Sequence, residues 1–210
     1  NHMKKAFLFL MLIPILNFAG GNKIGSQKVV TAYKVKDLEI KLDGKLTEPI
    51  WQEIPIKDFT QRDPNEGATP SEETHVWVAY DNTNLYTAAR LNDIKPESID
   101  ASLARRDAQI ESDWFTFFVD PYNDKKTGYY FAVNAGGTLS DGVLFNDSWD
   151  DNTWDGIWEA KTSIDDKGWT VEMRIPFSQL RFNEGNKMTW GVNFARDIKR
   201  NKERIFFVMV

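Results

Sequence analysis

HVWVAYDNTNLYTAARL, residues 75–91, carries the clearest structural signal in this chain. Apolar and polar residues alternate from His75 to Asp81 and again from Leu85 to Leu91, with the period of a β-strand that buries one face. Between them, Asn82-Thr83-Asn84 has the composition of a tight turn. The segment therefore predicts an antiparallel β-hairpin.

Outward from this hairpin, short alternating segments bounded by Gly, Asn, Asp or Pro recur along the chain. They are Leu38 to Leu42, Ile56 to Phe59, Trp114 to Val119, Thr127 to Val133, Thr138 to Asn146, Trp158 to Ile164, Trp169 to Ile175, Thr189 to Ala195 and Arg204 to Val210. Roughly ten strands without intervening long helices predict an all-β fold, an antiparallel β-sandwich of the jelly-roll or immunoglobulin-like type. Short helical turns are expected at Glu48 to Glu53 and Pro96 to Arg105.

The same alternation predicts the core, because side chains at every second position of a strand share one face. The inward set is Val76, Val78, Tyr80, Phe115, Phe117, Val119, Tyr129, Phe131, Val133, Trp169, Val171, Met173, Ile175, Trp190, Val192 and Phe194.

The N-terminus has the layout of an exported protein. Residues 1–3 look like a cloning remnant, and residues 4–19 combine Lys4-Lys5 with the apolar run from Ala6 to Phe18, as in a secretory signal peptide. We expect cleavage between Ala19 and Gly20, a flexible leader over 20–27, and one folded domain over 28–210 that continues beyond Val210. The expected location is secreted: periplasmic, cell-surface or extracellular.

Composition narrows the function classes. The 210 residues carry a formal net charge of −5, a sign that repels phosphate backbones and argues against nucleic-acid binding. The chain contains no cysteine, which excludes disulfides, thiolate metal sites and a cysteine nucleophile. No Ser-His-Asp grouping, phosphate loop or zinc signature is visible, so we expect no catalytic residues.

The segment DSWDDNTWDGIW, Asp147 to Trp158, is the first candidate binding element. It sets Trp149, Trp154 and Trp158 among carboxylates such as Asp155, and aromatic faces beside carboxylates suit a sugar, whose C–H face packs on a ring while its hydroxyls donate. The alternative is that a tryptophan folds onto the core and the aspartates are solvated.

Arg106, Asp113 and Arg196 are further candidates for sugar contacts. Arginine's planar fork serves sugar hydroxyls and carboxylates alike. The alternative is an internal salt-bridge network that braces loops, and the sequence favours it modestly.

Acidic and amide oxygens also cluster at Asp93, Asp120 and Asp124. Calcium prefers such oxygen ligands from loops, so these residues are candidate metal ligands. The alternative is that these aspartates form turns.

An ordered set of motifs runs along most of the chain. Its members are Asp43-Gly44, Glu48, Trp51, Val76 to Tyr86, Asp93, Asp113 to Asp120, Lys126 to Tyr130, Phe131 to Asn134, Gly168-Trp169, Glu172, Ile175-Pro176-Phe177, Trp190-Gly191 and Asn193. In this order the motifs resemble the family 9 carbohydrate-binding modules and the related family-9-like domains at the N-termini of larger bacterial outer-membrane proteins.

The resemblance implies a β-sandwich that binds glycan ends, often with calcium, and is attached to another domain. The family's sugar lies between two tryptophan rings; here Ile110 stands at the first ring's position, and the second would fall beyond Val210. Asp93 is the matching position for a calcium ligand. The expected partner is an oligo- or polysaccharide, together with a C-terminal membrane barrel or catalytic domain.

Three functions follow as hypotheses. The first is non-catalytic carbohydrate binding in polysaccharide recognition or catabolism. The second is a structural or docking domain in front of an outer-membrane β-barrel, without sugar binding. The third, a glycosidase built on paired carboxylates, is expected to be absent from this chain.

Overall fold

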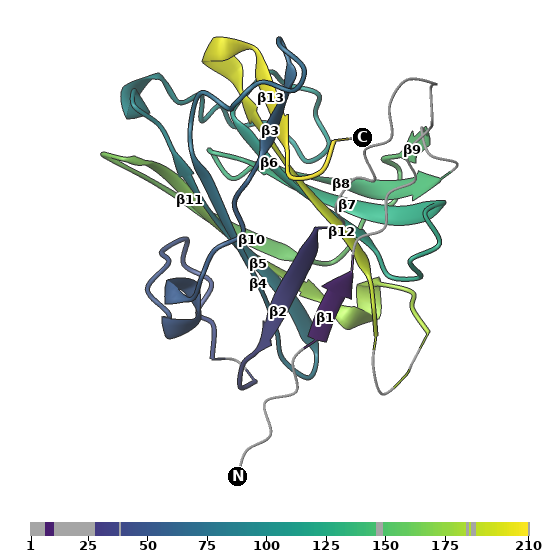
Figure 1. Ribbon diagram of the computed structural model, residues 1–210. Helices are drawn as coiled ribbons and strands as arrows, with labels where there is room; N and C mark the ends of the chain where they lie inside the picture. Colours follow the sequence, from purple (N-terminus) through teal and green to yellow (C-terminus); the bar gives the residue numbers. More distant parts are fainter. Residues whose placement is uncertain are drawn as a thin grey trace.

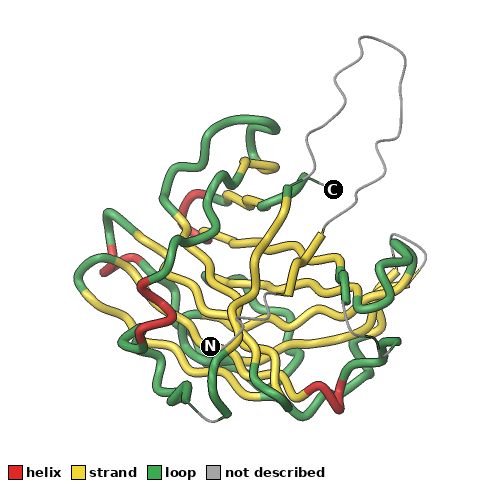
Figure 2. Tube along the Cα trace, turned by 60° about the horizontal axis from the view of Figure 1, so that its bottom comes forward, coloured by secondary structure: helices red, strands yellow, loops and turns green. Residues whose placement is uncertain are grey.

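The computed structural model describes residues 7–10, 28–37, 39–145, 149–183, 185 and 188–209. Its strands form two sheets packed face to face, which confirms the predicted all-β sandwich (Figure 1, Figure 2). Helical structure in the described residues is limited to the short 3-10 turns η1 (Pro49–Gln52), η2 (Pro96–Ser98), η3 (Phe177–Gln179) and η4 (Lys199–Asn201). Within the same residues, no helix is long and apolar enough to span a membrane.

The first sheet has six strands in the order β1-β2-β4-β5-β11-β10. Their bounds are β1 (Phe7–Leu10), β2 (Val29–Lys34), β4 (Thr74–Tyr80), β5 (Asn84–Asn92), β11 (Gly168–Pro176) and β10 (Glu159–Asp165). β2 runs parallel to β4, whereas the other neighbours are antiparallel.

The second sheet has seven strands, all antiparallel, in the order β3-β13-β12-β6-β7-β8-β9. Their bounds are β3 (Thr60–Asp63), β13 (Glu203–Phe206), β12 (Gly191–Ile198), β6 (Trp114–Asp120), β7 (Thr127–Asn134), β8 (Leu139–Phe145) and β9 (Trp149–Asp151).

The predicted hairpin is confirmed. β4 and β5 pair antiparallel, with Tyr80 opposite Leu85. Asp81 shapes the turn, because its Oδ1 accepts hydrogen bonds from the backbone N–H groups of Thr83 and Asn84, both at 2.7 Å. A side chain that binds the backbone two or three residues ahead is a typical turn-forming device.

The main core lies between the sheets and contains the predicted inward set, with Tyr129 packed against it as a partly buried residue. Phe115, Phe131, Trp169 and Phe194 are completely buried. Alternation along the strands therefore predicted this layer correctly.

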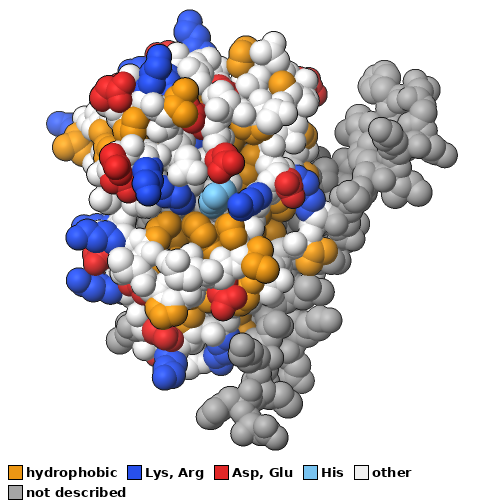
Figure 3. Space-filling view, turned by 60° about the vertical axis from the view of Figure 1, so that its left-hand side comes forward, with side chains coloured by type: hydrophobic (Ala, Val, Ile, Leu, Met, Phe, Trp, Pro, Cys, Tyr) orange, Lys and Arg blue, Asp and Glu red, His pale blue; other side chains and the backbone are white. Residues whose placement is uncertain are grey.

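A second apolar cluster covers the outer face of the six-stranded sheet. It comprises Ile40, Trp51, Trp77, Ala79, Tyr86 and Ala88. The segment that carries η1 supplies Trp51 and lies against this face (Figure 1). Figure 3 shows apolar side chains gathered there beside a histidine, among charged groups of both signs. β4 and β5 are therefore buried on both faces.

Several predicted elements differ from the structure. Residues 39–42 form no strand, and Leu38 lies outside the described residues. Ile56 makes only an isolated bridge to Val76. A strand over Ile56 to Phe59 is interrupted because Asp58 has a left-handed backbone, φ +67°, which extended strands exclude.

Other boundaries also shift. The helical turn expected from Pro96 ends at Ser98, and the last strand ends at Phe206. β2, β3 and β9 were not predicted, and each is short. β2 and β3 pair with strands far away in the sequence, whereas β9 pairs with the preceding strand β8. β1 lies within the expected signal peptide, and the rest of residues 4–27 lies outside the described part of the chain.

Candidate functional site

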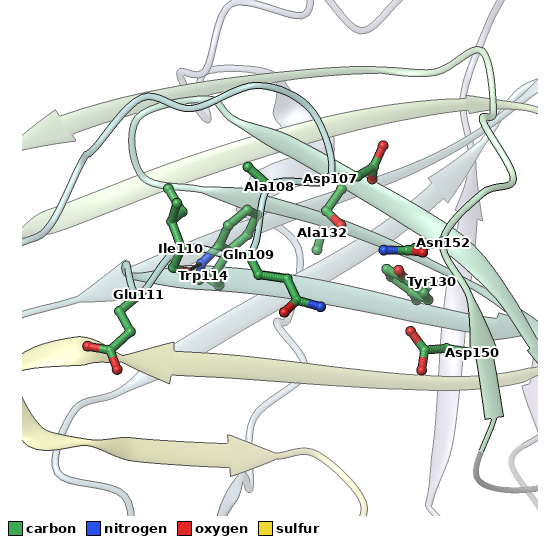
Figure 4. A pocket seen from close by; sticks show the side chains of 11 residues that line it. Asp107, Ala108, Gln109, Ile110, Glu111, Trp114, Tyr130, Ala132, Asp150 and Asn152 are labelled. Carbon is green, nitrogen blue, oxygen red and sulfur yellow. Dashed lines mark hydrogen bonds between the residues drawn. The ribbon is translucent and has the colours of Figure 1, made fainter.

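An open groove of about 390 Å³ lies on the outer face of the seven-stranded sheet, over β6, β7 and β8. Its volume falls near the small end of the range for ligand sites, about 300–1,000 Å³. The lining residues are Asp107, Ala108, Gln109, Ile110, Glu111, Trp114, Tyr130, Ala132, Ser140, Asp150 and Asn152. The segment 107–111 forms one wall, and the end of β9 forms the other (Figure 4).

The floor of the groove follows from strand alternation. Phe115 and Phe131 point into the core, so their neighbours Trp114, Tyr130 and Ala132 point to the opposite, outer face. Trp114 and Tyr130 are each half-buried. The outer face therefore presents two aromatic side chains from adjacent strands.

The ring of Tyr130 packs directly against a glycine on the neighbouring strand. Gly142 is its direct partner on β8, and a Cβ at Gly142 would lie 2.6 Å from Cε1 of Tyr130 and 2.7 Å from the backbone oxygen of Asp151. Both distances are shorter than contact distance. Only glycine leaves room for the phenol ring in this position.

The wall over 107–111 is held to the sheet at both ends. The backbone N–H of Asp107 donates to the backbone oxygen of Leu139 at 3.0 Å. At the other end, the indole N–H of Trp114 donates to the backbone oxygen of Ile110 at 3.2 Å. This hydrogen bond from Trp114 fixes the position of the wall relative to the floor of the groove.

Polar groups gather at one end of the groove. In Figure 4, the side chains of Gln109, Tyr130, Asp150 and Asn152 point toward one another. Burial raises the pKa of Tyr130, and the charges of Asp150 and Asp107 raise it further. A hydrogen bond with the Ser140 side chain lowers the pKa and offsets part of this rise. The phenol is protonated at neutral pH.

The predicted tryptophan loop is divided between the two faces of the sheet. Trp158 is buried and packs edge-on against Phe131, with ring centroids 5.3 Å apart. Trp154 is half-buried against Tyr129 on the same core side, at 5.1 Å. Both rings therefore pack onto the core, as the alternative interpretation of this segment expected. They lie on the side of β7 opposite the groove.

The same segment nevertheless reaches the groove through its polar residues. Asp150 and Asn152 line it, whereas the side chain of Trp149 and all of Asp147 lie outside the described residues. The segment singled out from the sequence therefore contributes to the groove through Asp150 and Asn152, whereas Trp154 and Trp158 lie on the core side.

Arg106 anchors three carboxylates. It forms a charge-assisted hydrogen bond to the fully buried Asp141 and ion pairs with Asp155 at 3.3 Å and Asp107 at 3.7 Å. Its Nη2 also donates to the backbone oxygen of Gly156 at 2.7 Å. Oxygens of the three aspartates lie within 4.8 Å of one another, and this one guanidinium pairs with all three. The arrangement is that of a brace between loops.

Asp113 and Arg196 lie inside the sandwich. Both are buried, and Arg196 donates to the backbone oxygens of Glu73 and Asn92. Asp113 accepts from the backbone N–H of Asp100 at 2.8 Å. Burial lowers the pKa of Arg196 to about 10, and burial raises the pKa of Asp113. Neither side chain reaches a ligand on the surface.

Asp93 does not fit the role of a calcium ligand. Its Oδ2 pairs with the guanidinium of Arg200 and lies 3.9 Å from that of Arg196. Its Oδ1 accepts from the backbone N–H of Lys95 at 2.7 Å. The charge of this carboxylate is therefore already compensated by two guanidinium groups.

Asp120 and Asp124 shape one turn between β6 and β7. Asp120 accepts from the backbone N–H groups of Tyr122 and Lys125, and Asp124 accepts from that of Thr127. Burial raises the pKa of Asp120. This geometry supports the turn-forming alternative.

Sequence reasoning missed Trp114, Tyr130, Gln109 and Glu111 as site residues. A signal for the first two was present: once Phe115 and Phe131 are assigned to the core, the aromatics beside them must face outward. For Gln109 and Glu111 no sequence signal existed, because they lie on a segment without regular structure whose path is fixed by distant strands.

The fold is that of the β-sandwich domains, here with an aromatic-floored groove on one outer face. Residues 42–207 match the family described as carbohydrate family 9 binding domain-like, and this chain belongs to that family. Its members are binding domains without catalysis, so the expectation of a non-enzyme is confirmed by the family.

Solved structures share the fold. One match is a family 9 carbohydrate-binding module from Caldicellulosiruptor kristjanssonii in complex with cellotriose, with a TM-score of 0.58 and 16% identity. The match covers 83% of this chain and 82% of that module. Its glucose complex gives a TM-score of 0.55, 16% identity, and coverage of 83% and 85%. A protein from Bacteroides uniformis, described as a candidate carbohydrate-binding protein, matches with a TM-score of 0.64 and 16% identity. The match covers 85% of this chain and 88% of that protein. Comparison with curated proteins gave no significant match.

Proposed function

We propose that the groove over β6, β7 and β8 is a saccharide-binding site, and that the chain serves polysaccharide recognition. The observation that carries the proposal is the pairing of Trp114 and Tyr130 with a ring of hydrogen-bonding groups in one open groove. Aromatic faces take the apolar C–H face of a pyranose, and side-chain oxygens accept from its hydroxyls.

The groove also coincides with the position at which the family resemblance places a stacking ring. Ile110 stands at that position, and it lines the groove between Gln109 and Glu111. Tyr130 and Trp114 supply the aromatic surface that Ile110 lacks. The related module from Caldicellulosiruptor holds cellotriose and glucose, which supports short gluco-configured saccharides as ligands to test.

Two adjacent tyrosines provide a matched test. Tyr130 faces the groove, whereas Tyr129 faces the core side and contacts Trp154. In calorimetric titration with cellotriose, Tyr130→Leu is expected to weaken binding at least tenfold, equivalent to about 1.4 kcal/mol. Tyr129→Leu is expected to reduce thermal stability while leaving affinity unchanged. Equal affinities for the two variants would contradict the assignment of the groove.

We also propose that the protein is secreted. The support is the sequence of residues 4–19, a charged start followed by an apolar run. Expression in a bacterial host, cell fractionation and N-terminal sequencing test it. A mature chain that begins at Gly20 outside the cytoplasm is the expected result, and an intact cytoplasmic chain would contradict it.

The docking alternative has one specific observation in its favour: Ile110 replaces a stacking ring. In that case the domain joins a C-terminal membrane barrel or catalytic domain without binding sugar. Titration with cellotriose separates the two functions, because a docking domain gives no heat of binding.

A further inference from the structure

We propose that the groove selects glycans by charge, binding cationic amino sugars and neutral sugars while rejecting uronate-bearing or sulfated ones. This inference rests on the proposed saccharide-binding function. It concerns which sugars enter, and the feature behind it is the distribution of charge around the groove.

The described lining residues carry charge of only one sign. Asp107, Glu111 and Asp150 line the groove, and none of the described lining residues is lysine or arginine. Arg106, which directly precedes the wall in the sequence, is a basic group paired with Asp107, but it also pairs with Asp141 and Asp155. One guanidinium shared by three carboxylates leaves the wall negative.

The dimensions make this charge effective throughout the groove. A sphere of the groove's volume would be about 9 Å across, close to the Debye length of about 8 Å at physiological ionic strength. A ligand in the groove therefore lies within about one Debye length of the lining carboxylates, where their charges are only partly screened. Asp150 faces the interior beside Tyr130 and Asn152, where a sugar substituent would come closest (Figure 4).

Two further observations support a negative potential. The charges of Asp150, Asp107 and Asp141 all favour the protonated form of the Tyr130 phenol. In contrast, the opposite face of the molecule interleaves acidic and basic side chains (Figure 3). The single sign at the groove is therefore a local property and does not follow from the overall charge of −5 alone.

The test compares β-1,4-linked trimers of glucose, glucosamine and glucuronate, which share one backbone and differ in charge. In calorimetric titration of the full chain at low salt, we expect the glucosamine trimer to bind several-fold more tightly than cellotriose. We expect the glucuronate trimer to bind at least tenfold more weakly. Both differences should shrink as salt is raised, because screening weakens charge interactions.

Matched variants assign the effect to the groove. Asp150→Asn removes one lining charge and is expected to reduce the differences in affinity among the three trimers. Glu66→Gln removes one exposed charge next to β3, the strand at the opposite edge of this sheet, and is expected to leave these differences unchanged. If both variants reduce the affinity differences equally, those differences arise from the overall charge, and the inference is overturned.

The two proposals fail differently. Glucuronate binding as tight as that of cellotriose overturns charge selection and leaves saccharide binding intact. No binding of any trimer, with a folded protein by circular dichroism, overturns the saccharide site itself.

Discussion

The indole nitrogen of Trp51 donates a hydrogen bond of 2.9 Å to a carboxylate oxygen of Glu172, across 121 positions of sequence. The other oxygen of Glu172 accepts from the backbone N–H groups of Asp43 and Gly44 at 3.0 and 2.8 Å. One buried carboxylate on β11 thus holds the segment that covers the outer face of the six-stranded sheet.

Trp51→Phe is expected to lower the free energy of unfolding by about 1–3 kcal/mol, because a buried carboxylate oxygen loses its donor. Urea denaturation measures the loss. Glu53→Gln, an exposed change in the same segment, is the control and should have little effect. Equal midpoints for the tryptophan variant and the wild type would mean that this hydrogen bond does not secure the segment.

Stability should also depend on pH through Glu172. Burial raises the pKa of Glu172 to about 7, above its ordinary value of 4.5. Between these values the folded state holds a proton that the unfolded state releases, so this group's contribution falls as pH rises from about 4.5 to 7. Other groups titrate in part of this range, so the comparison with Glu172→Gln isolates the effect. The wild type should lose stability relative to the variant as pH rises; parallel curves would contradict this.

Arg106→Met is expected to destabilise the fold by about 1–3 kcal/mol, because the buried Asp141 carboxylate loses the hydrogen bonds of a partly exposed guanidinium. Asp141 is fully buried, and this change removes the guanidinium that neutralises it. Affinity for cellotriose should fall as well, because Arg106 directly precedes the wall of the groove. Thermal unfolding and titration give the two readouts, and Arg105→Met, an exposed neighbour, serves as the control.

Gly142→Ala is expected to weaken saccharide binding, because the new methyl group would displace the Tyr130 ring from the floor of the groove. The substitution also presses on the backbone of Asp151, so some loss of stability accompanies it. A double-mutant cycle with Tyr130→Leu separates the two effects. If the glycine acts through Tyr130, adding Gly142→Ala to Tyr130→Leu causes little further loss of affinity; full additivity would contradict this.

Removing calcium is expected to leave the melting temperature unchanged. The candidate ligand Asp93 pairs with Arg200, and Asp120 and Asp124 bind the backbone of their own turn. Thermal melts with a chelator and with millimolar calcium test this. A rise of several degrees in calcium would show that these carboxylates bind the ion after all.

Much of the fold was predictable from local sequence. Alternation in HVWVAYD and WFTFFV fixes which side chains face inward, and this period is a property of the extended backbone itself. The hairpin, the sandwich and the main core follow from it. Short strands such as β9 were not predictable, because three residues carry too little periodicity.

The sequence by itself determined the all-β architecture, the inward-facing side chains of the main strands, and that no cysteine takes part. Only the tertiary structure determined the site. It placed Trp154 and Trp158 on the core side of β7 and brought the wall over 107–111 beside the end of β9. The physical reason is range: strand periodicity acts between near neighbours in sequence, whereas a groove is formed by side chains that meet only after distant strands have paired.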